Sequence, residues 1–246
     1  LERDPFNNCL PVYPWNFVRT NTIFGVIHAA GGYTAWSDKH PAYSSVSGPG
    51  DGTNLDDFYA PEINSDVVAL KGVTTPLGLA CDPIPDPTAD LTAWTNSFLN
   101  IECYDTLKVN AILNEIDGYS HNRKKKTKVP AIFGMNFQAV SVGQKLIEAT
   151  VGKGGYLDAE GTPSARLVHE IEFVDAAVGE WTAELEKQGL SDSTLVIITA
   201  KHGQSPIDSQ RYVGITTSGP VTTSPSMIID DCLPPSESNS GGQIGP

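Results

Sequence analysis

The sequence is poor in basic residues: 16 Lys and Arg stand against 29 Asp and Glu, which gives a formal net charge of −13 at pH 7. This balance argues against a nucleic-acid polymer as a partner, because binding to a phosphate chain needs a basic surface. No run of about 18 apolar residues occurs, so we expect neither a membrane-spanning segment nor a membrane partner. The four cysteines form no C-x-x-C pair, which disfavours a zinc ribbon or a redox motif.

Several enzyme signatures are also missing. The sequence contains no G-x-S-x-G, Walker A or G-x-G-x-x-G motif, so the hydrolase-elbow, NTPase and dinucleotide-binding interpretations lack their signatures. It contains no internal repeat, low-complexity tract or evident linker. Because 39% of the residues are hydrophobic, a chain of 246 residues can bury a real core, and we treat residues 1–246 as one domain.

The cysteines that are present point to an exported protein. An acidic chain with few lysines and with much Ser, Thr, Gly and Pro is typical of a secreted protein with one or two disulfides. Cys81 and Cys103 enclose 21 residues and are the pair that we expect, with free buried thiols as the alternative. The basic residues cluster once, at 123–128, where we expect a solvated loop, with an anion-binding or membrane-surface patch as the alternative.

The order of predicted elements indicates the fold class. Apolar residues at helical spacing predict helices at 17–30, 104–118 and 162–189, the last with Thr162 as N-cap and Gly189 at its end. Apolar segments predict strands at 33–36, 129–135 and 193–200, the last two buried, whereas residues 44–100 are expected to be mostly loops. Helix followed by strand, three times over, is typical of an α/β fold with a largely parallel β-sheet flanked by helices.

Polar residues follow each predicted strand. They form the loops Ser37-Asp38-Lys39-His40, Asn136-Phe137-Gln138 and Lys201-His202-Gly203-Gln204-Ser205. Functional groups of α/β proteins gather beyond the carboxyl ends of the strands. Three such loops in register therefore suggest one shared site.

At these loops the sequence resembles the type I phosphodiesterase/nucleotide pyrophosphatase branch of the alkaline-phosphatase superfamily. The resemblance is sharpest over residues 29–41, 133–144 and 195–206. It implies an alkaline-phosphatase-like α/β fold and a hydrolase of phosphomonoesters, phosphodiesters or nucleotides, hence a small phosphorylated substrate. It also implies two zinc-type ions that activate a Thr or Ser nucleophile.

Only part of the implied metal site is matched. His202 stands where the family has a histidine ligand, and we assign it as the metal ligand. Lys201 and Asn136 each replace a ligand Asp, and Val140 replaces a ligand His. These replacements argue against a complete two-zinc site, although a lysine can hold a phosphate where a metal would otherwise do so.

Four residues are assigned as catalytic candidates: Asp38, His40, Asn136 and Lys201. Asp38 and His40 either replace metal ligands or contact the substrate. The structural alternatives are a cap or turn role for Asp38, His40 and Asn136, and a solvent-facing side chain for Lys201. The remaining histidines are expected to be structural (His28) or solvated (His121 and His169).

The resemblance places the family's first-strand Asp and its nucleophile upstream of Leu1, and its last His-Gly downstream of Pro246. We therefore expect the chain to be an internal part of a longer domain that lacks its N- and C-terminal parts, with the nucleophile outside these residues. The alternative function is that of a catalytically inactive relative that binds a ligand or partner through the same strand-end cleft.

Overall fold

The structure is a computed structural model that describes residues 3–6, 8–63, 65, 70–89, 93–200, 203 and 206. The chain divides into two compact units, Leu1–Leu157 with Pro163–Gly203, and Asp158–Thr162 with Gln204–Pro246. In the second unit, the described residues include a turn in which the Thr162 amide donates to Asp158 Oδ1 at 2.9 Å. All further elements lie in the first unit.

A short parallel sheet forms the centre of the first unit. Strand β3 (Ala35–Ser37) pairs in parallel with β4 (Asp57–Tyr59), with Ala35 opposite Asp57. Residues 132–135 run parallel along the other side of β3, where the Ala35 amide donates to the Ile132 carbonyl at 3.0 Å and the Ser37 amide to the Gly134 carbonyl at 2.9 Å. The parallel α/β arrangement expected from the sequence is thus present, with 132–135 next to β3.

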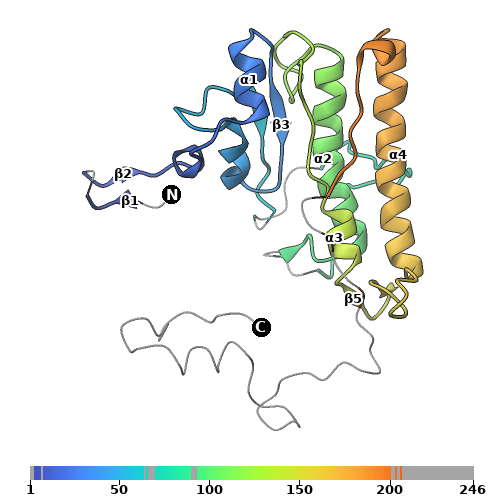
Figure 1. Cartoon of the computed structure of the whole chain (residues 1–246). Helices are drawn as coiled ribbons and strands as arrows, with labels where there is room; N and C mark the ends of the chain where they lie inside the picture. Colours follow the sequence, from blue (N-terminus) through green and yellow to red (C-terminus); the bar gives the residue numbers. More distant parts are fainter. Residues whose placement is uncertain are drawn as a thin grey trace, which may run out of the picture. The chain divides into compact units, whose positions relative to one another are not determined.

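Helix α1 (Ile23–Ala29) precedes β3 (Figure 1). It begins later than predicted, because Thr22 Oγ1 accepts the Gly25 amide and caps it, whereas Pro14–Phe17 forms a separate 3-10 turn, η1. It ends as predicted, since Gly31 takes φ +85°, a left-handed conformation that glycine adopts without strain. The 3-10 helix η2 (Pro41–Ser47) follows β3.

Three helices pack together beside the sheet: α2 (Phe98–Ile116), α3 (Ala139–Gly143) and α4 (Ala165–Lys187) (Figure 1). Ser164, and not Thr162 as predicted, is the N-cap of α4, because its hydroxyl accepts the Leu167 amide at 3.2 Å. The prediction that Gly189 ends this helix is confirmed by its φ of +70°.

The helices share an apolar core whose buried members include Trp94, Ile101, Tyr104 and Phe173. The predicted disulfide Cys81–Cys103 is present within it, with a Cα–Cα distance of 5.7 Å and both cysteines fully buried. A second cluster joins Ile112, Ile116 and Leu185 to the half-buried Phe133 and Met135 of the third sheet segment. Helices α2 and α4 are thereby held against the parallel sheet.

The remaining elements are small. Two antiparallel pairs join β1 (Arg3–Asp4) to β2 (Leu10–Pro11) and β5 (Ile147–Glu148) to β6 (Gly152–Lys153), and the 3-10 turn η4 (Ser191–Ser193) follows α4. Among the described residues, no helix is both long enough and apolar enough to cross a bilayer.

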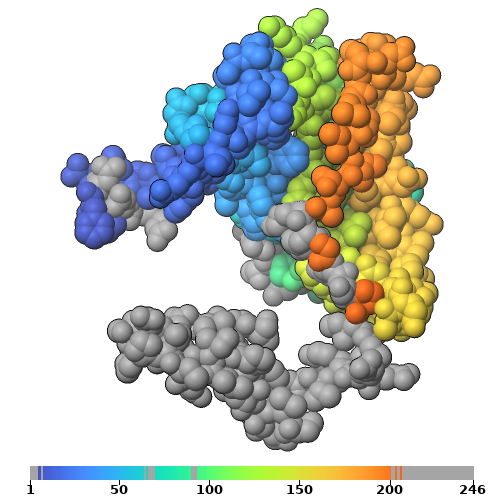
Figure 2. Space-filling model, in the orientation of Figure 1, coloured from blue at the N-terminus to red at the C-terminus, as the bar shows by residue number. Residues whose placement is uncertain are grey.

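The buried strand predicted at Ser193–Ala200 is wrong. Residues 194–200 form no strand, and Leu195, Ile197 and Ile198 are 82%, 73% and 76% exposed. Figure 2 shows this segment (orange) on the surface beside α4. An apolar run becomes a buried strand only where a neighbouring strand takes up its amides and carbonyls, and within the part of the chain that the structure describes no bridge joins it to another segment.

Candidate functional site

Two of the three strand-end loops meet. Asp38 directly follows β3, and Asn136 directly follows the parallel segment beside it. The Asn136 amide N–H donates to the Ser37 carbonyl at 3.1 Å, and its Nδ2 donates to Asp38 Oδ1 at 3.2 Å. Residues 98 positions apart therefore share one site at the carboxyl end of the sheet, as the strand order requires.

Among the candidate residues that the structure describes, Asp38 is the most enclosed, with 2% of its surface exposed. Its Oδ1 also accepts the Lys39 amide at 2.8 Å, and its Oδ2 accepts the indole N–H of Trp36 at 3.0 Å. Both carboxylate oxygens thus have donors from the protein. Asp38 connects the end of β3 to the Asn136 loop.

His40 lies at the outer side of this junction. Its Nδ1 pairs with Glu62 Oε1, and its ring stacks on Tyr43 at a centroid distance of 6.1 Å. The ring is about one-third exposed, and it precedes Pro41, the first residue of η2. His40 is therefore an oriented, solvent-accessible imidazole at the edge of the site.

Lys39 is a site residue that was not among the candidates predicted from the sequence. Its Nζ donates to Gln138 Oε1 at 2.9 Å, which ties the first loop to the second and places a half-buried cation beside Asp38. The signal was available, since a lysine stands inside the polar strand-end loop. The metal chemistry that the family resemblance implies uses Asp and His as ligands and gives this lysine no role.

The second strand-end loop is held by a buried ion pair on α2. Lys108 Nζ lies 2.9 Å from Asp105 Oδ1, and both side chains are fully buried on α2. Lys108 also donates to the Asn136 carbonyl at 2.5 Å, while Asp105 Oδ2 accepts the amides of Gln138 (2.6 Å) and Ala139 (2.8 Å). The pair thus fixes the backbone of the Asn136 loop and the start of α3. Charged residues at i and i+3 within an apolar helix were the available signal.

The described strand-end residues do not fit a two-zinc site. Asp38 is already saturated by donors, Asn136 turns its amide group toward Asp38, and Val140 offers no ligand atom. Over the described ranges, no three His, Cys, Asp or Glu side chains are grouped so that they could hold a metal ion. Lys201 and His202, in the third loop, lie outside the described residues.

The other three histidines all have acidic partners. His28 is structural, as predicted, with Nδ1 3.3 Å from Asp56 Oδ2. The prediction that His121 is solvated is wrong, because its Nδ1 lies 2.5 Å from Asp57 Oδ1 and its side chain is 24% exposed. His169 is 38% exposed, in keeping with its prediction, and its Nε2 lies 3.1 Å from Glu102 Oε1. Both partner carboxylates are buried, which is why these rings are held.

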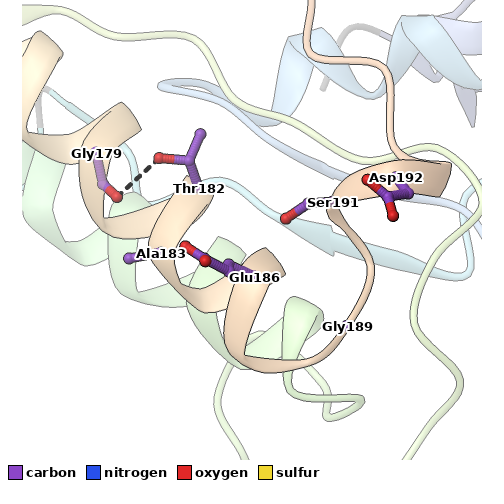
Figure 3. A pocket seen from close by; sticks show the side chains of 7 residues that line it. All are labelled: Gly179, Thr182, Ala183, Glu186, Gly189, Ser191 and Asp192. Atoms are coloured by element: carbon purple, nitrogen blue, oxygen red, sulfur yellow. Dashed lines mark hydrogen bonds between the residues drawn. The ribbon is translucent and has the colours of Figure 1, made fainter.

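A pocket of about 620 Å³ lies along the last turns of α4 and the turn that follows (Figure 3). Its polar lining consists of Thr182, Glu186, Ser191 and Asp192. None of the strand-end residues lines it, and its two carboxylates repel a phosphorylated ligand. We therefore place the candidate site at the strand ends.

The chain was also compared with known protein families, curated proteins and solved structures. Residues 105–219 match the model of the type I phosphodiesterase/nucleotide pyrophosphatase family, a member of the alkaline-phosphatase superfamily. The match confirms the predicted family over this part of the chain, and it spans Asn136, Lys201 and His202, whereas Asp38 and His40 precede it. The searches of curated proteins and of solved structures gave no match.

Proposed function

Because residues 105–219 are a type I phosphodiesterase/nucleotide pyrophosphatase segment, we propose that the chain is part of a secreted hydrolase of small phosphomonoesters or phosphodiesters, such as nucleotides. The observation that carries the proposal is the contact of Asp38 with Asn136. It brings the loop that precedes the family match together with a loop inside it, at the end of the sheet where α/β enzymes bind ligands.

The strand-end residues suit a phosphoryl group. In our proposal, the Lys39 and Lys201 ammonium groups and the Asn136 amide hold phosphoryl oxygens, and His40 or His202 transfers a proton to the leaving oxygen. The buried Asp105–Lys108 pair keeps the Asn136 loop in position before the substrate arrives, so that little binding energy is spent on ordering it. The nucleophile is expected outside these 246 residues.

Secretion is supported by the Cys81–Cys103 disulfide, since such bonds form and persist in oxidising compartments. Localisation of a tagged full-length protein, by fractionation of culture medium and cells, tests this part of the proposal.

Activity is tested on the full-length protein that contains these residues, with p-nitrophenyl phosphate and the p-nitrophenyl ester of thymidine monophosphate. Lys201→Ala and His202→Ala should each lower kcat/KM on the order of 100-fold. The control is Lys153→Ala, because Lys153 is exposed on β6 and lies in none of the three strand-end loops. Unchanged activity in His202→Ala would remove His202 from the mechanism.

A second function is favoured by the surroundings of Asp38. A carboxylate whose oxygens already accept from Trp36, Lys39 and Asn136 is a poor metal ligand, and Val140 replaces the family's histidine. The chain would then belong to an inactive relative that binds a phosphorylated ligand through the same loops. Zinc bound in stoichiometric amount together with ester hydrolysis would contradict this alternative, and saturable nucleotide binding with neither would support it.

A further inference from the structure

Basic charge is concentrated in one loop of this acidic protein. Five of the 16 Lys and Arg residues stand at positions 123–128, directly after α2. Tyr119 and Lys126 form an antiparallel bridge there, the Ser120 amide donates to the Lys125 carbonyl at 2.8 Å, and the Thr127 amide donates to the Gly118 carbonyl at 2.8 Å. We call residues 118–128 the basic hairpin.

The basic hairpin is anchored to the sheet. Asp57, the first residue of β4, accepts the His121 amide at 2.7 Å through Oδ2 and lies 2.5 Å from the His121 ring through Oδ1. Asp57 is buried, and the ring of Tyr59 stacks on His121 at 4.8 Å. The turn of the basic hairpin is therefore attached to β4 through His121.

The five cations of the basic hairpin differ in whether an acidic side chain pairs with them. Arg123 is neutralised, because its guanidinium lies 2.6 Å from Asp117 Oδ2. By contrast, none of the four lysines forms an ion pair with an acidic side chain that the structure describes. Four exposed cations at 124, 125, 126 and 128 remain available to an external anion.

Three of these lysines line a pocket. Lys125, Lys126 and Lys128 line an open pocket of about 450 Å³, together with Gly31, Gly32 and Tyr33. This volume lies within the range of small-molecule sites. A Cβ on Gly31 would meet no atom within 4 Å, so there is open space next to this lining residue.

One carboxylate lies in the same pocket. Asp56 Oδ2 accepts the Thr34 amide at 2.9 Å and lies 3.3 Å from His28 Nδ1, so its charge is partly taken up by these donors. Three lysines against one carboxylate leave the lining with an excess of two positive charges. The rest of the protein is strongly acidic and repels long polyanions, so a compact, multiply charged anion fits better.

We propose that this pocket is a binding site for a phosphoryl dianion, either free inorganic phosphate or the phosphate of a monoester or lipid headgroup. Lysine ammonium groups bind phosphate as point charges with several N–H donors each. The pocket includes Tyr33, which precedes β3, whereas Asp38 follows it, so the two sites lie at opposite ends of one strand. The site does not depend on whether the strand-end loops catalyse a reaction.

The test is a titration of the full chain with inorganic phosphate at constant ionic strength, followed through backbone amide NMR signals, with chloride as the blank. Signals of residues 31–33 and 125–128 should shift together and saturate. Lys125→Gln/Lys126→Gln/Lys128→Gln should weaken phosphate binding at least about tenfold. The matched control, Lys71→Gln/Lys145→Gln/Lys153→Gln, makes the same charge change at exposed lysines outside the pocket and should bind as the native protein does.

Co-sedimentation with phosphatidylcholine vesicles, with or without phosphatidic acid, distinguishes a lipid headgroup from free phosphate as the ligand. Saturable binding of free phosphate that the pocket variant loses identifies a soluble ligand. Binding only to phosphatidic-acid vesicles, lost in the same variant, identifies a lipid headgroup. Equal loss of binding in the control variant, or no binding of either probe by the native protein, overturns the proposal.

Discussion

Lys108 and Asp105 form an ion pair at 2.9 Å with no exposed side-chain surface, and each of them also holds the backbone of the loop that carries Asn136. Lys187 and Glu184 form a pair with the same i, i+3 spacing on α4, but Lys187 is 68% exposed there. The protein thus contains a buried and a solvated version of one interaction, which allows their consequences to be compared directly.

Lys108→Met should destabilise the protein by about 3–5 kcal/mol, because it leaves the buried Asp105 carboxylate without its counter-charge. Lys187→Met should leave the free energy of unfolding nearly unchanged, since Lys187 is largely exposed and Gln188 Nε2 still donates to Glu184 Oε1 at 2.8 Å. Urea denaturation of both variants measures the difference. Similar midpoints for the two would mean that Asp105 finds another partner.

Two buried glutamates should make the protein less stable as the pH rises. Burial, with a contribution from Glu102 and Asp105, raises the pKa of Glu170 to about 9, and burial next to Asp57 raises the pKa of Glu115 to about 9. Each carboxyl is neutral in the folded state, whereas in the unfolded chain it ionises near pH 4.5. Each therefore contributes full stability below that pH and loses it progressively up to about pH 9, by at most about 1.4 kcal/mol per pH unit.

Glu170→Gln should accordingly raise stability at pH 8 and flatten the dependence of the unfolding free energy on pH. Glu172→Gln is the control, because Glu172 lies two positions away on α4 with 64% of its side chain exposed. Thermal unfolding between pH 5 and pH 9, a window of about 4 units that covers the transition, gives the slopes. An unchanged slope in Glu170→Gln would show that Glu170 is ionised in the folded protein.

The disulfide should contribute about 3 kcal/mol, since it closes a loop of 22 residues. We expect Cys81→Ala/Cys103→Ala to lower the midpoint of unfolding in urea. Reductant should lower the midpoint of the native protein by a similar amount. Reductant added to the double variant should change nothing further. A further loss there would point to a second disulfide.

Ile112 and Ile198 both lie in apolar segments of the sequence, but only Ile112 is buried in the structure. Ile112→Ala should cost about 2–5 kcal/mol because Ile112 is 2% exposed, whereas Ile198→Ala should change stability by less than about 0.5 kcal/mol because Ile198 is 76% exposed. If Ile198→Ala is as costly as Ile112→Ala, residues 193–200 form the buried strand that the sequence predicts.

Local signals were enough to predict most helices and the direction of the sheet. Gly31 ends α1, Gly189 ends α4, and apolar spacing marks α2. Periodicity does not tell whether a run such as Leu195–Ile198 will find a neighbouring strand, because the neighbour comes from elsewhere in the chain. The start of α4 was predicted at the wrong residue, because Thr162 and Ser164 are both good N-caps and only the folded backbone selects Ser164.

The candidate site was predictable in position but not in detail. Strand order alone brings Asp38 and Asn136 to one edge of the sheet. Lys39 acts through a contact with Gln138, which lies far away in the sequence. Asp105 and Lys108 lie on α2, and a sequence pattern does not distinguish a buried charged residue of a helix from an exposed one. The third loop, with Lys201 and His202, keeps its assignment as a prediction.

The exposed apolar segment at 195–198 has a consequence for colloidal stability. At neutral pH the net charge of −13 keeps molecules apart in solution and shields this segment from self-association. That repulsion vanishes near the isoelectric point of about 4.6, in the acidic range where the buried carboxyls of Glu115 and Glu170 favour the folded state most. Solubility and folding stability therefore have opposed pH preferences, and low ionic strength at pH 7–8, where this repulsion is least screened, should serve concentration of the protein better than acid.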